Sequence, residues 1–364
     1  MASELYIGLM SGTSIDGVDA VLVDFGSKPL RSLAAVQVPF PPALRNELTA
    51  LQRAGADEIH RAALASNSLM DCFAGAVSAL LTKVQLPPQA VTAIAVHGQT
   101  IRHRPELGYT VQLANPARLA EETGITVVAD FRSRDVAAGG QGAPLVPAFH
   151  ATVFGKSDTH RVVVNLGGIA NITDLPPRGD VRGFDTGPGN TLLDAWCERH
   201  KSKPFDSDGA WAATGRVKKE LLSSLETDSY FKLPPPKSTG RDYFNLAWLE
   251  GHLAPAYAPA DVQRTLVSLT AKTIAAAVNA HCASATEVLA CGGGANNALL
   301  MQELNVVLAP RKLSTTAEHG VPVNEVEALA FAWLARETLA GRTGNLPSVT
   351  GARGERILGA IYRA

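Results

Sequence analysis

The chain has 364 residues with a formal net charge of -1 at pH 7, and 46% of the residues are hydrophobic. This length predicts two domains, each large enough to bury a core. The balanced charge gives no basic surface for nucleic acid or an anionic membrane. The N-terminus has no basic segment, and no apolar run approaches the roughly 20 residues of a membrane span. We therefore expect a soluble, cytoplasmic protein.

The cysteines predict no metal or disulfide framework. The four of them stand far apart without a CxxC pair or a His-rich cluster: Cys72, Cys197, Cys282 and Cys291. That pattern argues against a structural zinc site and against disulfides. We expect reduced, buried thiols.

The first 25 residues predict a β-hairpin with a long loop. Residues 5–10 and 18–25 are apolar runs, and residues 11–17 between them are rich in hydroxyl groups and glycine. Such a loop is too long for a two-residue turn, and its backbone N–H groups suit the wrapping of a phosphate. An ordinary hairpin with a polar tip remains the alternative.

The rest of the first half predicts alternating helices and strands. Apolar spacing and capping residues place helices at 42–54, from 57 onward and at 116–123, and strands at 93–96, 109–113 and 126–129. His97 directly follows a buried strand, where polar groups are candidates for ligand contact. A structural histidine with satisfied hydrogen bonds is the alternative, and position alone favours it.

Charged residues at 130–135 and glycines at 139–144 suggest a crossing between two lobes. The charges are either a solvated run or part of that crossing, with the glycines as a mobile joint. We place the boundary near Phe131. The first lobe then comprises residues 1–130 plus 345–364, because a strand at 356–362 is expected to return to it. The second lobe comprises residues 131–344.

The second half repeats the theme of the first. Strands at 161–166 and 172–175 flank a glycine-rich turn at 167–171, which predicts a second hairpin. A short strand at 182–184 leads to Asp185, a Gly/Pro-rich turn and a helix at 191–200. A carboxylate at that position is either a helix cap or a catalytic base. Capping alone does not explain the glycines and proline before the helix.

A third glycine turn comes late in the chain. A strand at 287–290, the glycines 292–294 and a helix at 296–305 resemble a dinucleotide fingerprint that lacks its third glycine. No GxxxxGK[ST] phosphate loop is present. An NAD-dependent enzyme is therefore a weak alternative, although Glu318 lies near the expected distance. An apolar helix at 323–339 carries Glu325 and Glu327.

The ordered set of three turns resembles the actin, Hsp70 and sugar kinase superfamily. This resemblance implies an α/β, two-lobed actin-like ATPase (ribonuclease H-like) fold with an interlobe cleft. In such proteins the two hairpin loops hold the phosphates from opposite lobes, and the late glycine turn supports the adenine. Lobe closure about the glycines at 139–140 would exclude bulk water.

Within the superfamily the chain is similar to the anhydro-N-acetylmuramic acid kinase family. The matching segments run from the first strand to the last, at 8–17, 97–100, 130–132, 139–147, 165–171, 183–190, 236–241 and 291–297. Ile15 stands where such enzymes often have Met. The resemblance implies an enzyme that opens the 1,6-anhydro bridge with water and phosphorylates O6 from ATP, during cell-wall recycling in Gram-negative bacteria.

The resemblance also implies roles for individual residues. Asp185 is the expected catalytic base, acting on water because O6 in the bridge has no proton to give. The expected sugar-binding residues are His97, Arg132, Asp185 and Glu327. The expected ATP-binding residues are Ser11, Gly12, Thr13, Ser14, Ile15, Asp16, Gly17, Val18, Gly167, Gly168, Asn171, Gly292, Gly293, Gly294 and Asn296. Mg²⁺ is expected with the ATP, without a dedicated metal site, and the family suggests a homodimer.

Several alternatives stay open beside these roles. Instead of binding the sugar, Arg132 could form a salt bridge between the lobes, and Glu327 could pair with a neighbouring basic residue. A nucleotide-driven switch or filament protein would keep the fold without a sugar substrate. A kinase for an ordinary sugar or a carboxylate would keep both fold and reaction class.

Overall fold

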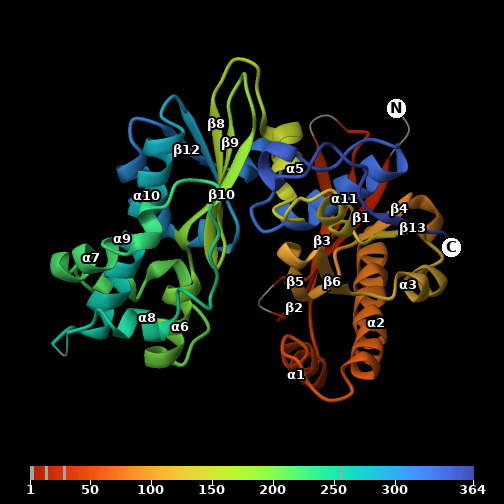
Figure 1. Cartoon of the computed structure of the whole chain (residues 1–364), viewed down its shortest axis with the longest axis horizontal. Helices are drawn as coiled ribbons and strands as arrows, with labels where there is room; N and C mark the ends of the chain where they lie inside the picture. Colours follow the sequence, from red (N-terminus) through yellow and green to blue (C-terminus); the bar gives the residue numbers. More distant parts are fainter. Residues whose placement is uncertain (1–3, 13–14, 28–29, 255) are drawn as a thin grey trace. The chain divides into compact units, whose positions relative to one another are not determined.

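The structure is a computed structural model that describes residues 4–12, 15–27, 30–254 and 256–364 (Figure 1). It divides into two compact units, Met1–Val153 with Gly320–Ala364, and Phe154–His319. The first unit is larger than the predicted first lobe at both ends, because residues 131–153 and 320–344 also belong to it. Helix α11 (Val326–Leu339) packs directly on strand β1 (Leu5–Met10), which ties the later segment to the first strand.

A six-stranded sheet forms the centre of the first unit. Its order is β13-β7-β4-β1-β2-β3. The bounds beyond β1 are β2 Gly17–Asp24, β3 Arg31–Pro39, β4 Ala93–Val96, β7 Val127–Ala129 and β13 Ala360–Tyr362. Strands β1, β2 and β3 are antiparallel neighbours, whereas β4 and β7 run parallel to β1. The first hairpin and the return of the last strand are both confirmed.

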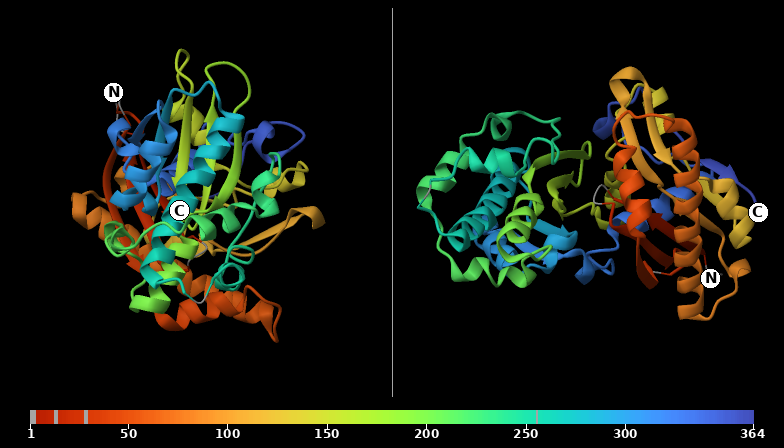
Figure 2. Two further views of the ribbon diagram at one scale, coloured as in Figure 1. Left: turned by 90° about the vertical axis from the view of Figure 1, so that its left-hand side faces the viewer. Right: turned by 90° about the horizontal axis from the view of Figure 1, so that it is seen from below.

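Helices cover both faces of this sheet. The side chains of Leu5, Ile7 and Leu9 share a core with α2 (Glu58–Val84), the long helix labelled in Figure 1 and seen from other sides in Figure 2. Side chains alternate across a strand, so Gly8 faces α11 instead. A Cβ on Gly8 would lie 1.9 Å from the carbonyl oxygen of Ala328. Glycine therefore permits the close approach of α11 to β1.

The remaining elements of the first unit are shorter. They are α1 Pro42–Ala50, β5 Gln99–Arg104, β6 Tyr109–Leu113, α3 Pro116–Thr123, α4 Ser133–Ala137, α5 Val146–Phe154 and α12 Pro347–Thr350. The predicted cap of α3 is confirmed, since the side chain of Asn115 accepts a hydrogen bond from the Arg118 amide. Helix α2 is long and apolar enough to cross a membrane, but half of its most apolar window is buried inside this unit.

The second unit repeats the strand order of the first. Its sheet runs β10-β9-β8-β11-β12, with bounds β8 Arg161–Leu166, β9 Ile169–Leu175, β10 Arg182–Pro188, β11 Glu287–Cys291 and β12 Lys312–Thr315. Three antiparallel strands are again followed by parallel ones. The α/β class and the second hairpin are confirmed. The turn itself is tighter than predicted, because β9 starts at Ile169.

The core of the second unit lies between its sheet and a central helix. That helix is α9 (Pro259–His281), which packs with Val162, Val164 and Leu166 of β8. The other helices are α6 Thr191–Lys201, α7 Lys219–Glu226, α8 Leu246–Glu250 and α10 Ala298–Leu308. Odd-numbered positions of β8 and β9 face away from this core. They include Asn165 and Asn171 near the glycine tip, beside apolar residues such as Val163.

Candidate functional site

The first hairpin loop is fastened to strand β5. Ser11 donates a 2.5 Å hydrogen bond from Oγ to Oε1 of Gln99, and Nε2 of Gln99 donates to the carbonyl of Gly12 at 3.2 Å. Ser11 and Gln99 are both 1% exposed. The hydroxyl of Ser11 is thus engaged by Gln99 and the whole residue is buried, so Ser11 helps to position the loop.

The other predicted residues of this loop differ in what they expose. The side chains of Ile15 and Val18 lie in the hydrophobic core, and as whole residues they are only 4% and 0% exposed. They therefore shape the loop from within and present no group to solvent in this structure. Asp16 is exposed, and Gly17 already belongs to β2. Thr13 and Ser14 lie outside the described residues.

His97, Arg132 and Glu327, the residues that the resemblance marks for sugar binding, come together in the first unit. Arg132 donates from Nη2 and Nε to Nε2 of His97 at 2.8 and 3.2 Å, and from Nη1 to the Gly142 carbonyl at 2.7 Å. The ring of Phe331 lies beside both, 4.8 Å from the His97 ring and 6.0 Å from the Arg132 guanidinium carbon. Packing and hydrogen bonds therefore fix the guanidinium.

The imidazole of His97 is neutral in this arrangement. A guanidinium can only donate hydrogen bonds, so Nε2 of His97 accepts from Arg132 and carries no proton. The ring proton therefore sits on Nδ1, which lies 2.8 Å from the Gly98 carbonyl oxygen. Burial, followed by the charge of Arg132, lowers the pKa of His97 to about 3. Both nitrogens already have protein partners. The histidine thus holds Arg132, and the structural reading of His97 fits better than direct sugar contact.

Two carboxylates, those of Glu327 and Asp135, lie close enough to Arg132 for their charges to act on its guanidinium. Burial lowers the pKa of Arg132 to about 10, and the charge of Glu327 opposes that shift. The pKa of Glu327 is raised by desolvation and then by Asp19, although its side chain is exposed to solvent. Burial, followed by the charge of Asp16, raises the pKa of Asp19 to about 6. The first unit therefore presents one held cation with acidic side chains near it.

In the second unit the glycine tip lies against the start of helix α6. The amides of Asn190 and Gly189 donate to the carbonyls of Gly167 and Gly168 at 2.8 and 2.9 Å, and the amide of Thr191 also donates to Gly168 at 3.0 Å. Helix α6 begins at Thr191. The Thr191 amide is thus used by the tip, and the N–H groups that follow it in the first turn of α6 are the ones that can attract an anion there.

The late glycine turn packs against the end of β8. Gly292 has a φ of 80°, and a Cβ on it would lie 2.4 Å from Oδ1 of Asn165. After the turn the chain forms a short 3-10 turn, Gly293–Asn296, and α10 begins at Ala298 rather than at 296. Asn297 caps that helix. Asn296 is exposed, and its Nδ2 donates to the Gly293 carbonyl at 3.2 Å.

Asp185 lies in a row of polar side chains across three strands. Asn171 of β9 is paired with Asn165 of β8 on one side and with Asp185 of β10 on the other. Residues paired in this way project from the same face of a sheet. All three are half-buried, on the face away from α9. The ladder shifts register directly after Asp185, so β10 bends at this point.

The loop at 236–241 holds Asp185 in place. The backbone amide of Asp185 donates to the Lys237 carbonyl at 3.1 Å, and Oδ2 of Asp185 accepts from the Thr239 amide at 3.0 Å. The Tyr230 hydroxyl donates to the Asp185 carbonyl oxygen at 2.9 Å. Burial raises the pKa of Asp185 to about 6, against the lowering effects of Thr239 and Lys237. This carboxylate is basic enough to take a proton near neutral pH.

The predicted residues gather in two sets, one within each unit. The first set is the hairpin loop with His97, Arg132 and Glu327, and the second is Asp185 with Asn171 and the glycine turns. Sequence reasoning missed Lys237 and Thr239 as partners of Asp185. Residues 233–240 read as a rigid loop with a lysine and two hydroxyls, and the resemblance at 236–241 marked it too. Spacing gave no link between positions 185 and 239.

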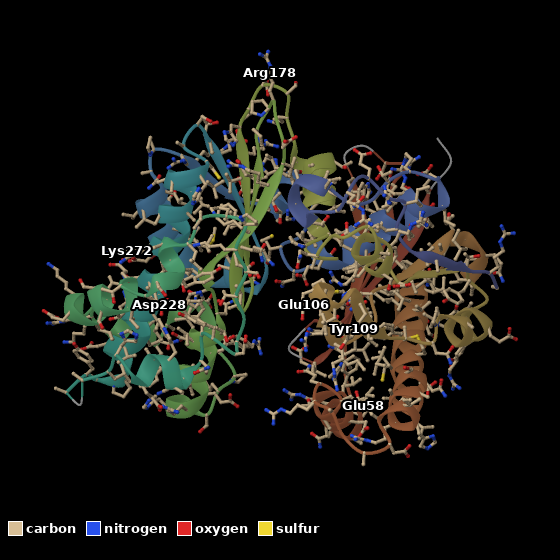
Figure 3. The ribbon with its side chains drawn as sticks, in the orientation of Figure 1. Glu58, Glu106, Tyr109, Arg178, Asp228 and Lys272 are labelled. Atoms are coloured by element: carbon tan, nitrogen blue, oxygen red, sulfur yellow. The ribbon has the colours of Figure 1, made fainter. Side chains whose placement is uncertain are left out.

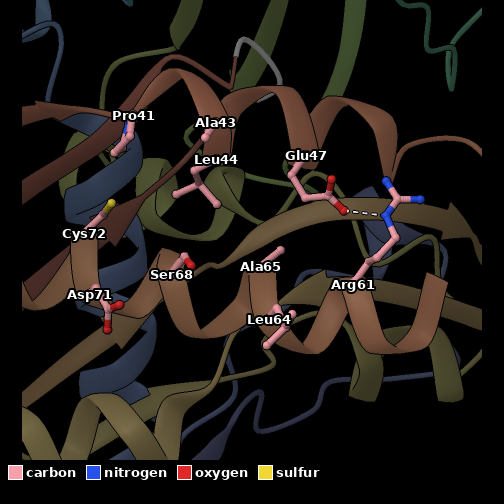
Figure 4. Close-up of a pocket in the computed structure, with 10 residues that line it drawn as sticks. All are labelled: Pro41, Ala43, Leu44, Glu47, Arg61, Leu64, Ala65, Ser68, Asp71 and Cys72. Carbon is pink, nitrogen blue, oxygen red and sulfur yellow. Dashed lines mark hydrogen bonds and ion pairs between the residues drawn. The ribbon is translucent and has the colours of Figure 1, made fainter. Parts of the chain in front are cut away.

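A separate hollow of 570 Å³ lies between α1 and α2 (Figure 4). Leu44 and Ala65 line it, and the ion pair of Glu47 with Arg61 lies at its edge. None of the predicted site residues lines it. Within the described part of the chain, no group of three or more His, Cys, Asp or Glu side chains is placed to hold a metal ion.

Comparison with known proteins identifies the family. The profile of the family described as anhydro-N-acetylmuramic acid kinase matches residues 4–364. A Bordetella petrii protein of that name is 58% identical over 99% of this chain and 96% of its own length. One from Cupriavidus pinatubonensis is 56% identical, with 98% of each chain covered.

A solved structure supports the fold. A reductive activator for a corrinoid, iron-sulfur protein superposes with a TM-score of 0.50 at 12% identity, covering 93% of this chain and 62% of that one. The predicted actin-like ATPase fold class is confirmed. The full-length match of sequence is the stronger finding, and by it the chain belongs to the anhydro-N-acetylmuramic acid kinase family.

Proposed function

We propose that the chain is an ATP-dependent kinase that hydrolytically opens the 1,6-anhydro bridge of anhydro-N-acetylmuramic acid and phosphorylates O6. The products are N-acetylmuramic acid 6-phosphate and ADP, and the reaction belongs to cell-wall recycling and amino-sugar catabolism. The observation that carries this proposal is the family match over residues 4–364. The raised pKa of Asp185, at a bend in β10, supports it independently.

Asp185 is the proposed general base, and water is its substrate. The carboxylate accepts a proton as the water oxygen bonds to C1 of the sugar. The C1–O6 bond breaks, and O6 keeps the electron pair and attacks the γ-phosphorus of ATP. The bond from that phosphorus to the β–γ bridging oxygen breaks, ADP leaves, and the proton passes from Asp185 to solvent. General-base assistance of this kind is worth roughly 10²–10⁴-fold.

The two glycine-bearing loops are the proposed phosphate contacts, and the turn at 292–294 is the proposed support of the adenine. The N–H groups in the first turn of α6 after Thr191 favour negative charge beside the tip at Gly167 and Gly168. Mg²⁺ fits the first unit, because Asp16 and Asp19 supply the oxygen ligands that it prefers. When bound with ATP it neutralises phosphate charge. Phosphoryl transfer depends mainly on such positioning and neutralisation.

Arg132 and Glu327 are the proposed sugar contacts. A guanidinium fork suits the two oxygens of the lactyl carboxylate, and Glu327 can accept from sugar hydroxyls. His97 then acts by holding Arg132 through Nε2. Arg132→Lys keeps the charge but loses the fork, so the KM for the sugar is expected to rise about tenfold or more with little change in the KM for ATP. Equal changes in both constants would argue against this contact.

The test of the function measures ADP release with and without the anhydro-sugar. Turnover is expected only with the sugar, with phosphate on O6 of a reducing product. Asp185→Asn is expected to bind ATP and sugar normally and to lose turnover by about 10²–10⁴-fold. Sugar-independent ATP hydrolysis would favour a switch or filament protein. Phosphorylation of a reducing sugar but not of the anhydro-sugar would favour a different kinase of this fold.

A homodimer and a cytoplasmic location are also part of the proposal. Both come from the family resemblance. Light scattering after size exclusion tests the first, since a particle of about 38.2 kDa would be a monomer and would reject it. Fractionation of the cells that make the protein tests the second.

A further inference from the structure

One loop contacts both the proposed base and the second glycine tip. Residues 237–239 hydrogen-bond Asp185, as described above. Two residues later, the guanidinium of Arg241 lies against Gly168. A Cβ built on that glycine would lie 3.1 Å from Nη2 and 3.3 Å from Nε of Arg241. Thr239 and Arg241 are at most about 7 Å apart along the chain.

The guanidinium of Arg241 is not used in polar contacts within the described part of the chain. Its side chain is exposed, and its guanidinium forms no hydrogen bond or ion pair within the part of the chain that the structure describes. A guanidinium carries five N–H donors in a planar fork that suits phosphate oxygens. The charge of Arg241 lowers the pKa of Asp194 in the first turn of α6, but the two side chains form no direct ion pair. The donors of Arg241 are therefore available to a ligand.

The other cation of this loop is already in use. Nζ of Lys237 donates to the carbonyl oxygen of Tyr230 at 3.2 Å and lies 4.6 Å from the centre of that ring. Its pKa is lowered by burial, which marks it as part of the packing. Lys237 thus anchors the loop, and Arg241 is left as the cation beside the tip.

We propose that Arg241 is a catalytic residue that donates hydrogen bonds to the γ-phosphate of ATP while that phosphate is transferred. Charge in phosphoryl transfer spreads over the three equatorial oxygens, and a guanidinium neutralises it without giving up a proton. Through residues 237–239 the same loop holds the base, so one segment aligns the base and the transferring phosphate. This inference rests on the proposed kinase function.

The experiment compares three variants of the full chain, Arg241→Ala, Arg241→Lys and Arg178→Ala. Arg178 is the matched control, because it is exposed and sits in the turn between β9 and β10, at the opposite end of the hairpin from Gly168 (Figure 3). Arg241→Ala is expected to lower kcat by about 10²-fold or more, and Arg241→Lys by less. Added guanidinium ion should restore part of the loss in Arg241→Ala. The control should match the unaltered protein.

Nucleotide affinity supplies a readout that does not need the sugar. Binding is measured by calorimetry with ADP and with a non-hydrolysable ATP analogue. Arg241→Ala should weaken the affinity for the analogue and leave the affinity for ADP unchanged. A kcat within threefold of the unaltered protein, or equal weakening of both nucleotides, would overturn the role of Arg241. If the unaltered protein shows no sugar-dependent turnover, the kinase proposal fails instead, and the two affinities still decide whether Arg241 contacts the terminal phosphate.

Discussion

At the scale of single residues, environment rather than residue type sets the chemistry. His97 follows the buried strand β4 and Asp185 lies within β10, yet burial has opposite consequences for the two groups. It keeps the imidazole neutral with a pKa of about 3, and it makes the carboxylate more basic, with a pKa of about 6. Desolvation disfavours the charged form of each group. One becomes a fixed acceptor for Arg132 and the other a proton acceptor.

The raised pKa of Asp185 predicts how activity depends on pH. The base works only when ionised, so kcat is expected to fall about tenfold for each pH unit below roughly 6. His97 should not contribute a step between pH 5 and 8, because its pKa is far below that range. A pH profile of turnover checks both statements. An acidic limb centred near pH 4 would contradict the raised pKa.

The same shift predicts a cost in stability. A carboxyl whose folded pKa exceeds its unfolded value of 3.8 favours the fold below that value, and the contribution is lost as pH rises through about 6. Asp185→Asn removes the charge that the fold disfavours. The variant is expected to be more stable than the unaltered protein by about 1–3 kcal/mol at pH 8, and near equal at pH 4. Denaturant unfolding at both pH values measures this.

At the scale of elements, the contact of α11 with β1 positions Glu327. Ala328 follows Glu327 directly, and its carbonyl oxygen occupies the space where a Cβ on Gly8 would be. Gly8→Ala must therefore push the helix away from the strand, and overpacking of this kind costs about 1–3 kcal/mol or more. We also expect a higher KM for the sugar, because Glu327 moves with the helix.

Gly75 provides the matched control for this substitution. It lies in α2, and a Cβ built on it meets nothing within 4 Å. Gly75→Ala should stabilise the protein by up to about 1 kcal/mol, since alanine favours a helix over glycine. Thermal unfolding of both variants gives the comparison. A Gly8→Ala protein as stable as Gly75→Ala would mean that α11 is not closely held.

Local signals predicted most elements, and long-range contacts explain what they missed. The hairpins follow from apolar runs, and α3 from the cap at Asn115 and its proline. Residues 130–135 looked like a solvated charge run or a crossing between lobes. Asp135 is instead 0% exposed and accepts hydrogen bonds from the Gly142 amide and from Asn345 and Thr350. Partners more than 200 positions away leave no local pattern.

The site shows the same limit. His97, Arg132 and Glu327 come from the end of β4, the start of α4 and the start of α11. Their meeting depends on the order of strands in the sheet and on the packing of Phe331 against His97. Sequence could nominate each of them through the family resemblance. It could not show that His97 uses both of its nitrogens within the protein.

At the scale of the whole molecule, the second unit is an insertion within the first. The first unit uses residues on both sides of it, whereas Phe154–His319 is continuous and has its own core. Arg161 joins the start of that unit to its sheet, because it donates to the Phe154 carbonyl at 3.0 Å and to Glu287 of β11 at 2.6 Å. Because its sheet, core and closing contacts all lie within one segment, this unit has what an independent domain needs.

The two units should therefore behave differently when cut apart. A fragment of residues 154–319 is expected to fold alone and to unfold in one cooperative transition, followed by circular dichroism during heating. Residues 1–153 alone lack α11 and β13, so the α11 face of the sheet and the edge of β7 would be exposed. That fragment should aggregate or stay unfolded until residues 320–364 are added or fused to it. Cooperative folding of 1–153 by itself would show that α11 is dispensable to the first core.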